Sequence, residues 1–194
     1  MIKRSLLLMT LFLALLGGAR AQSELTVYEG TATSNVVPAY VFYFDDFTRS
    51  QFVIPADDLT EMDGGTISSL KFYTTASNIP YTALSSARVY LMEVNYTTIE
   101  ALEPTANGQI VYEGYFDFVS EGDGGSLTIG FTSPYTYGGG NLLVGIENTE
   151  DSGYKSIYFY GTSVNGASWA GSNSSSLDGV TGSQRNFIPK TTFT

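Results

Sequence analysis

The side chains best suited to chemistry in this chain are carboxylates and tyrosines, because the sequence contains no histidine and no cysteine. Histidine is the commonest general base near neutral pH and the commonest metal ligand. A Ser-His-Asp triad, a cysteine nucleophile and a typical zinc site are therefore excluded by composition. The remaining candidates are built from the 19 acidic residues and the 14 tyrosines.

An acidic stretch in the first third of the chain is the candidate metal site. Its carboxylates are Asp45, Asp46, Asp57, Asp58, Glu61 and Asp63, of which the first four are the expected ligands. Calcium takes oxygen ligands from flexible loops, and carboxylates suit it. The spacing matches no EF-hand loop, and a solvated acidic loop is the preferred interpretation. A structural calcium ion is thus the one cofactor that the sequence leaves open.

Aromatic side chains late in the chain form a candidate ligand-binding platform. The expected contacts are Trp169, Tyr135, Tyr137, Tyr154 and Asn141, with Tyr158 and Tyr160 close in sequence. An exposed aromatic ring can stack against the C–H face of a sugar while a neighbouring amide supplies hydrogen bonds. Trp169 is the strongest candidate, because it lies in a polar Gly/Ser-rich segment that we expect to be a loop. The alternative is that these rings fill an ordinary β core.

Two glutamates are the only candidates for catalysis. A glycosidase needs two carboxylates on either side of the bond it cleaves, and Glu93 and Glu147 both lie on expected strands. Each could equally end or edge its strand in water. The chain also has a single tryptophan, whereas comparable small glycosidases are richer in it. We therefore expect no enzymatic activity.

The first 21 residues have the features of a secretory signal peptide. Lys3 and Arg4 precede an apolar run over 5–16, and Ala19-Arg20-Ala21 gives a small-x-small cleavage pattern. No second apolar run of that length follows, so no membrane insertion is expected. Cleavage would remove three basic residues and lower the net charge from −10 to about −13. Such a surface repels phosphate, which argues against nucleic acid and anionic membranes as partners.

The remaining chain, 22–194, reads as one all-β domain stabilised by its core rather than by disulfides. Alternating apolar runs separated by glycine-rich turns favour an antiparallel sandwich or barrel. In 66–74, a bulge near Ser68 and Ser69 would bring Ile67 into phase with the apolar residues that follow. Gly145 indicates that a neighbour passes close by, and 164–186 reads as one long loop. The expected strands are 25–29, 40–44, 50–54, 66–74, 87–94, 109–118, 126–131, 141–147, 155–160 and 190–193.

Several stretches, taken in order, carry a resemblance to a known module. The strongest is residues 131–144, with Pro134-Tyr135 followed by Gly138-Gly139-Gly140, and the closing stretch is 185–193. Together they resemble jelly-roll β-sandwich modules of Bacteroidetes surface proteins, akin to the cleaved-adhesin domains of gingipain-type proteins and found beside fibronectin type III-like domains. The resemblance implies a jelly-roll sandwich of about nine to ten strands that acts in attachment, display or substrate capture. It supplies no catalytic residues.

Together these features predict an exported, non-catalytic binding or adhesion module that works as a monomer. Its ligand would be a glycan or a protein outside the cell. Modules of the resembled kind usually sit within longer chains, so 22–194 would be the N-terminal module of a longer protein. The alternatives are an architectural spacer that displays neighbouring domains and, less favoured, a small jelly-roll glycosidase.

Overall fold

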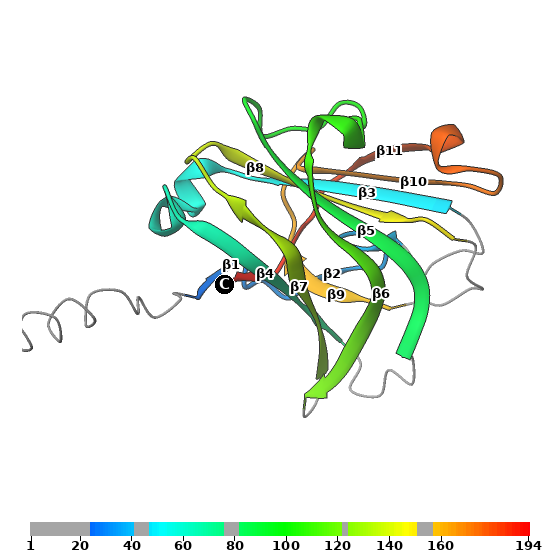
Figure 1. Cartoon of the computed structure of the whole chain (residues 1–194), viewed down its shortest axis with the longest axis horizontal. Coiled ribbons are helices and arrows are strands. Elements are labelled where there is room, and N and C mark those ends of the chain that lie inside the picture. The colour runs from blue at the N-terminus through cyan, green and yellow to red at the C-terminus, as the bar shows by residue number, and fades with distance from the viewer. Residues whose placement is uncertain (1–23, 41–46, 76–81, 122–123, 151–156) are drawn as a thin grey trace, which may run out of the picture.

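The computed structural model describes residues 24–40, 47–75, 82–121, 124–150 and 157–194. Within these residues there are thirteen strands and no α-helix. Every strand pair is antiparallel. The strands form two layers packed face to face, which confirms the predicted all-β antiparallel sandwich, although with more strands than the nine or ten expected (Figure 1).

The two layers are called sheet A and sheet B. Sheet B has the spatial order β6 (Gln109–Glu121), β5 (Thr82–Val94), β8 (Asn141–Asn148), β3 (Phe47–Ile54), β10 (Ser168–Asn173) and β11 (Thr181–Arg185). Sheet A contains β1 (Leu25–Val27), β13 (Thr191–Phe193), β4 (Thr66–Thr74) and β7 (Gly124–Thr136), together with β9 (Phe159–Thr162), β2 (Ala32–Ser34) and β12 (Ile188–Pro189). The last residues of β6 also pair with β7, so this strand joins the two sheets.

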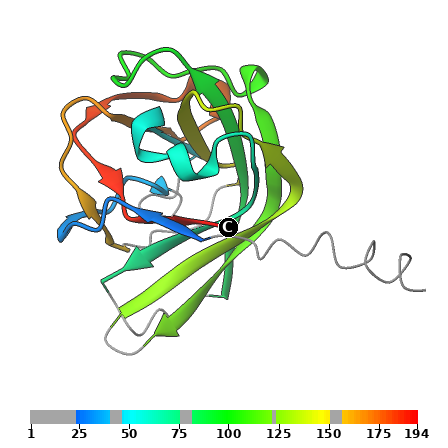
Figure 2. The ribbon, with the colours of Figure 1, turned by 90° about the vertical axis from the view of Figure 1, so that its left-hand side faces the viewer.

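The interior between the sheets is filled by alternating apolar residues of both layers. Phe52 of sheet B meets Phe72 of sheet A edge to face, with ring centroids 6.1 Å apart, and Phe72 meets Phe159 in the same way at 6.4 Å. One end of this interior is covered by two short 3₁₀ turns, η2 (Ala56–Asp58) and η3 (Thr60–Met62), which lie between the layers in the end-on view (Figure 2). Leu59, between the two turns, is fully buried.

Two local predictions for the strands are confirmed. In β4 the pairing with β7 shifts between Ile67 and Ser69, and this bulge leaves Ile67 fully buried together with Leu70. In β8, a Cβ atom added at Gly145 would lie 2.1 Å from Cζ of Tyr90. The neighbour that passes close to Gly145 is therefore the ring of Tyr90 on β5.

Residues 95–108, called the strap, cross the outer face of sheet B. The strap is the green segment above β5 and β3 in Figure 1. The side-chain amide of Gln51 fixes it, because Nε2 donates to the carbonyl oxygen of Glu103 at 2.7 Å and Oε1 accepts from the Glu103 amide at 2.9 Å. Gln184 also donates to the carbonyl oxygen of Ile99 at 2.8 Å. The strap thereby covers a second, smaller apolar cluster: Val53, Tyr90, Met92, Ile99, Leu143 and Trp169.

The prediction that 164–186 is one long loop is wrong. This segment contains β10, the 3₁₀ turn η5 (Leu177–Gly179) and β11, and β10 pairs with β3 along its whole length. Small residues permit the pairing of β10 with β11: Gly171 and Gly182 face each other, and a Cβ atom at Gly171 would lie 2.2 Å from the Thr181 carbonyl oxygen. Composition alone suggested a loop because glycine and serine are also the usual turn residues. The predicted strand 40–44 lies outside the described residues except for its first residue.

Candidate functional site

Trp169 is not the exposed contact that the sequence predicts. It lies on β10 with its side chain on the outer face of sheet B, and it is only 8% exposed. The indole packs in the cluster beneath the strap with Val53 and Ile99. The indole ring therefore packs within the protein, because the strap covers the surface against which a ligand would stack.

Tyr135, Tyr137 and Asn141 do not form an exposed platform either. Tyr135 and Tyr137 are 8% and 0% exposed, and the Tyr137 hydroxyl donates to the Gly140 carbonyl oxygen at 2.6 Å. Burial raises the pKa of Tyr137 to about 12. Asn141 accepts from the Ala56 amide at 2.9 Å and donates to the Tyr96 carbonyl oxygen at 3.1 Å, so its side chain links η2 and the strap to the start of β8. Tyr154 lies outside the described residues.

The predicted calcium ligands are only partly within the described residues. Asp57 and Asp58 lie exposed in η2, and Asp45 and Asp46 fall outside the described part. The Tyr28 hydroxyl donates to Asp58 Oδ2 at 2.5 Å, and burial together with this bond raises the pKa of Tyr28. Among the described residues, no three carboxylates come close enough together to hold a metal ion.

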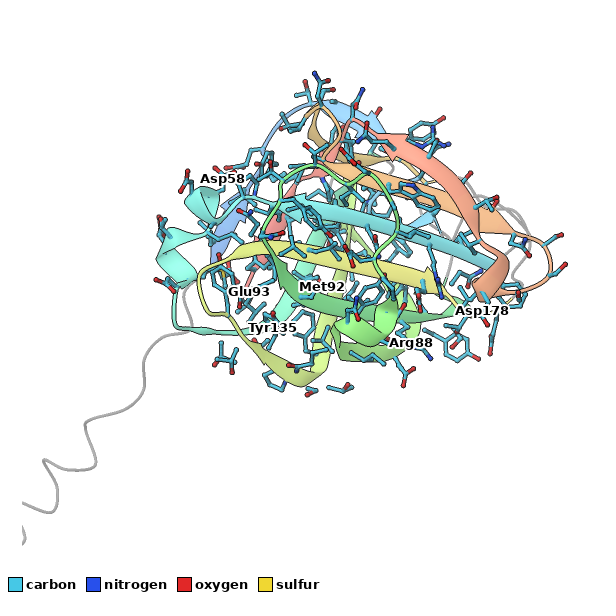
Figure 3. All side chains as sticks on the ribbon, turned by 90° about the horizontal axis from the view of Figure 1, so that it is seen from above. Asp58, Arg88, Met92, Glu93, Tyr135 and Asp178 are labelled. Carbon is cyan, nitrogen blue, oxygen red and sulfur yellow. The ribbon has the colours of Figure 1, made fainter. Side chains whose placement is uncertain are left out.

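Glu93 and Glu147 lie on opposite faces of sheet B. In the register of β8 against β5, Glu147 lies opposite Arg88, whereas Glu93 lies opposite Leu142. Arg88 and Glu93 are five positions apart on one strand, so their side chains point to opposite faces, about 17 Å apart along it. Figure 3 shows these two residues toward opposite ends of β5. The two glutamates therefore cannot act on one bond.

Each glutamate has an evident structural role. Glu93 accepts hydrogen bonds from the amides of Gly138 and Gly140, both at 2.7 Å, and so holds the turn between β7 and β8. Glu147 is fully buried and forms the centre of a row of alternating charges that crosses four strands. This charge ladder consists of Arg49, Glu147, Arg88 and Glu113.

The charge ladder is linked to the strap. Arg49 Nε lies 2.8 Å from Glu147 Oε1, an ion pair without hydrogen-bond alignment, and Arg88 Nη1 lies 3.3 Å from Glu147 Oε2. Arg88 Nε donates to Glu113 at 2.8 Å, and this bond raises the pKa of Arg88. The hydroxyl of Thr105, within the strap, donates to Glu147. The charged groups of the ladder therefore pair with one another and with Thr105 of the strap, and these contacts stabilise the outer face of sheet B.

The outer face of sheet A carries a hollow whose lining combines aromatic and charged side chains. The hollow has a volume of about 350 Å³, and we call it the Tyr73 hollow. Its lining includes Glu29, Thr31, Tyr73, Gly125, Tyr160 and Lys190. A larger hollow of about 600 Å³ lies on the strap, but Tyr96 is its only aromatic residue, and the Tyr96 hydroxyl is engaged by Glu103 at 2.7 Å.

The side chains of the Tyr73 hollow are held by strand pairing. Leu70 and Phe72 of β4 point inward, so Lys71 and Tyr73 point outward. The Tyr73 hydroxyl is 2.8 Å from Thr192 Oγ1 on the neighbouring β13. Lys190 follows β12, and its amide donates to the Tyr160 carbonyl oxygen at 2.8 Å, which places it beside Tyr160.

Two lysine ammonium groups lie close to the Tyr73 ring. Lys190 Nζ lies 4.5 Å and Lys71 Nζ 5.2 Å from the ring centroid. Lys190 Nζ also pairs with Glu29 Oε2 at 2.8 Å. Of the residues that line the hollow, only Tyr160 was among those suggested by the sequence, because Glu29, Tyr73 and Lys190 are far apart in the chain. The alternation in 70–73 could have shown that Lys71 and Tyr73 share the outer face, but not that Lys190 lies over the ring.

The comparisons with known proteins add no family to this picture. No protein-family model matches the chain, and no curated protein matches it. No helix in the described part of the chain is long and apolar enough to cross a membrane. The case for function therefore depends on the geometry described above.

Proposed function

We propose that this protein is an exported, non-catalytic binding module that holds an extracellular glycan at the Tyr73 hollow. The observation that carries the proposal is the hollow itself, which presents two half-buried tyrosines with a lysine and a glutamate at its rim. Binding sites typically combine aromatic lining with a few polar groups that fix orientation. A pyranose ring suits such a site, because its C–H groups can contact the rings and its hydroxyls can bond to the charged groups.

Export is supported by the N-terminal sequence pattern and by the acidic composition. A domain that carries a large net negative charge stays soluble and does not adhere to phosphate-rich surfaces. The test is to express the full chain in a bacterium and to determine the mass of the protein recovered outside the cytoplasm. We expect a chain that begins at Gln22. Retention of the full-length chain in the cytoplasm would contradict export.

Glycan binding is tested by calorimetric titration of the exported protein with a panel of oligosaccharides. Replacement of either ring, Tyr73→Ala or Tyr160→Ala, should weaken binding by about tenfold or more, because each removes a stacking surface. The matched control is Tyr115→Ala, since Tyr115 is a 55% exposed tyrosine on β6 that does not line the hollow. Equal weakening by all three variants would place the ligand elsewhere. A protein that unfolds cooperatively but binds no glycan would be the architectural spacer.

A further inference from the structure

The charges that line the Tyr73 hollow cancel each other. Among the described residues of the lining, Lys190 is the only cation and Glu29 the only carboxylate, and they form an ion pair with Nζ 2.8 Å from Oε2. The other lining residues are glycines, threonines and tyrosines. A charged ligand would lose hydration here without gaining an unpaired opposite charge, which is costly. The hollow therefore suits an uncharged ligand.

Glu29 stands at the tip of a tight turn that the fold holds in place. Tyr28, which precedes it, has a φ of 56°, a value that bulky residues rarely adopt. Gly30, which follows it, donates its amide to the Tyr28 carbonyl oxygen at 2.8 Å. A Cβ atom at Gly30 would lie 2.4 Å from the carbonyl oxygen of Gly161 on β9. Strain of this kind is typical of binding sites, and here the turn brings Glu29 to Lys190.

Lys190 is the fixed half of the pair. Its Nζ lies 4.5 Å from the centroid of the Tyr73 ring, and its side chain is 24% exposed, whereas that of Glu29 is 63% exposed. The carboxylate can therefore move at small cost, because an exposed ion pair contributes little to stability. An ammonium group has three N–H donors and a carboxylate has two acceptor oxygens, so the pair keeps hydrogen-bonding capacity for a ligand.

We infer that the Tyr73 hollow selects uncharged glycans and binds two adjacent hydroxyls of one sugar ring through Glu29 and Lys190. This inference rests on the proposed function, since it names the class of glycan held at the same site. One hydroxyl accepts a hydrogen bond from Lys190 Nζ, and its neighbour donates one to the Glu29 carboxylate. Both charged groups thus keep a partner when the ligand binds. A ligand carboxylate would satisfy Lys190 but would be repelled by Glu29.

The experiment compares each neutral sugar with its own form oxidised at the primary hydroxyls, which carries carboxylates on the same rings. The probes are cellotetraose, mannotetraose and galactotetraose, each titrated calorimetrically into the exported protein. We expect at least one neutral probe to bind about tenfold more tightly than its oxidised form. Methylation of the adjacent ring hydroxyls of that probe removes their hydrogen-bond donors and should lower its affinity by about tenfold.

Substitutions test the two halves of the pair. Glu29→Gln and Lys190→Met should each lower affinity for the neutral probe by about tenfold, because each removes one charged partner of the two hydroxyls. Glu29→Gln should also narrow the gap to the oxidised probe, because it removes the repulsion of the ligand's carboxylate. Arg185→Gln is the control, since Arg185 is exposed on β11 of the other sheet. Melting temperatures of all variants establish that they fold.

The outcomes separate the two proposals. If the oxidised sugars bind as well as the neutral ones, the selectivity is wrong while glycan binding stands. The same conclusion follows if methylation of the adjacent hydroxyls leaves affinity unchanged, or if Glu29→Gln strengthens binding of the neutral probe. If no sugar of either kind binds to the folded protein, the proposed function itself fails.

Discussion

On the outer face of sheet B, the strap lies over Gln51, Tyr90 and Trp169, whereas on the outer face of sheet A, Tyr73 stands at the rim of an open hollow. Both faces carry tyrosine, basic residues and glutamate. On the covered face, Glu147 is fully buried between two arginines. On the open face, the glutamate paired with Lys190 is mostly exposed.

This difference separates residues that stabilise the protein from residues that are free to bind. A buried charge must keep its partners, because leaving one unpaired in the interior is costly. An exposed ion pair contributes little and can exchange its partner for a ligand. If the two faces differ in this way, substitutions on the covered face should lower the free energy of unfolding, and substitutions around the Tyr73 hollow should lower the affinity for the ligand instead.

The largest loss is expected from Gly145→Ala on the covered face. The new Cβ atom would lie 2.1 Å from the fully buried ring of Tyr90, in the middle of a sheet that cannot move aside. We expect the free energy of unfolding, measured by urea titration, to fall by about 3 kcal/mol or more. Gly130→Ala on β7 is the control, because nothing lies within 4 Å of its added Cβ atom. Similar losses in both variants would show that the ring of Tyr90 is not what requires glycine.

A smaller loss is expected from Glu147→Gln. The substitution leaves Arg49 and Arg88 beside a neutral amide, and their side chains are 18% and 30% exposed. Because both guanidinium groups still reach water, we expect a loss of about 2 to 3 kcal/mol by urea titration. Glu113→Gln removes the exposed end of the same ladder and should cost less than about 1 kcal/mol. An equal cost at both positions would mean that the burial of Glu147 does not matter.

Alkaline pH should lower the stability of the covered face by about as much as Glu147→Gln does, or slightly less. Burial raises the pKa of Tyr90 to about 12, against the opposing hydrogen bond from Gln51. The folded pKa lies above that of the unfolded chain, so the stabilisation is complete below pH 10 and is lost as the pH rises through 12. We expect a fall of roughly 2 kcal/mol in the free energy of unfolding. Tyr90→Phe should remove part of this dependence, and identical pH curves would contradict the assignment.

The smallest effect is expected from loosening the strap with Gln51→Leu. This substitution removes both hydrogen bonds to the backbone of Glu103 and the one donated to the Tyr90 hydroxyl, and it should cost about 1 to 2 kcal/mol, much of it as local opening of the strap. Hydrogen exchange of the Glu103 amide, which donates to Gln51, measures that opening directly. The exchange of amides in β4, in the other sheet, should stay unchanged. Glycan binding at the Tyr73 hollow should also stay unchanged, and its loss would show that the two faces are coupled.

The sequence was informative where a feature is determined locally. The bulge in β4 follows from the phase of Ile67 against Leu70, and the close approach at Gly145 follows from a missing side chain within an apolar run. Both depend on the alternation of a single strand. The sandwich itself follows from many such runs separated by turns.

The candidate site depends on pairings between distant parts of the chain. Trp169 is buried because the strap, whose residues precede it by about seventy positions, crosses over sheet B. Lys190 meets Tyr73 because β13 pairs with β4. Likewise, only the register of β5 against β8 shows that Glu93 and Glu147 face opposite ways. None of these pairings has a signature in the local sequence, so composition could not show that Trp169, Tyr135 and Tyr137 are buried while Tyr160 lines the hollow beside Tyr73.

The way β6 pairs with both sheets affects how copies of this protein can meet. This strand pairs with β5 in one sheet and, through its last four residues, with β7 in the other, so β6 does not end either sheet on that side. Among the described strands, the path through both sheets ends at β1 and β11, and off this path the short strands β2 and β12 each pair only with β9. β1, β2 and β12 have three residues or fewer, and the five residues of β11 are polar or glycine and exposed. Borders that are very short or, like β11, hydrophilic are poor templates for strand addition, which lets many molecules crowd together without joining edge to edge.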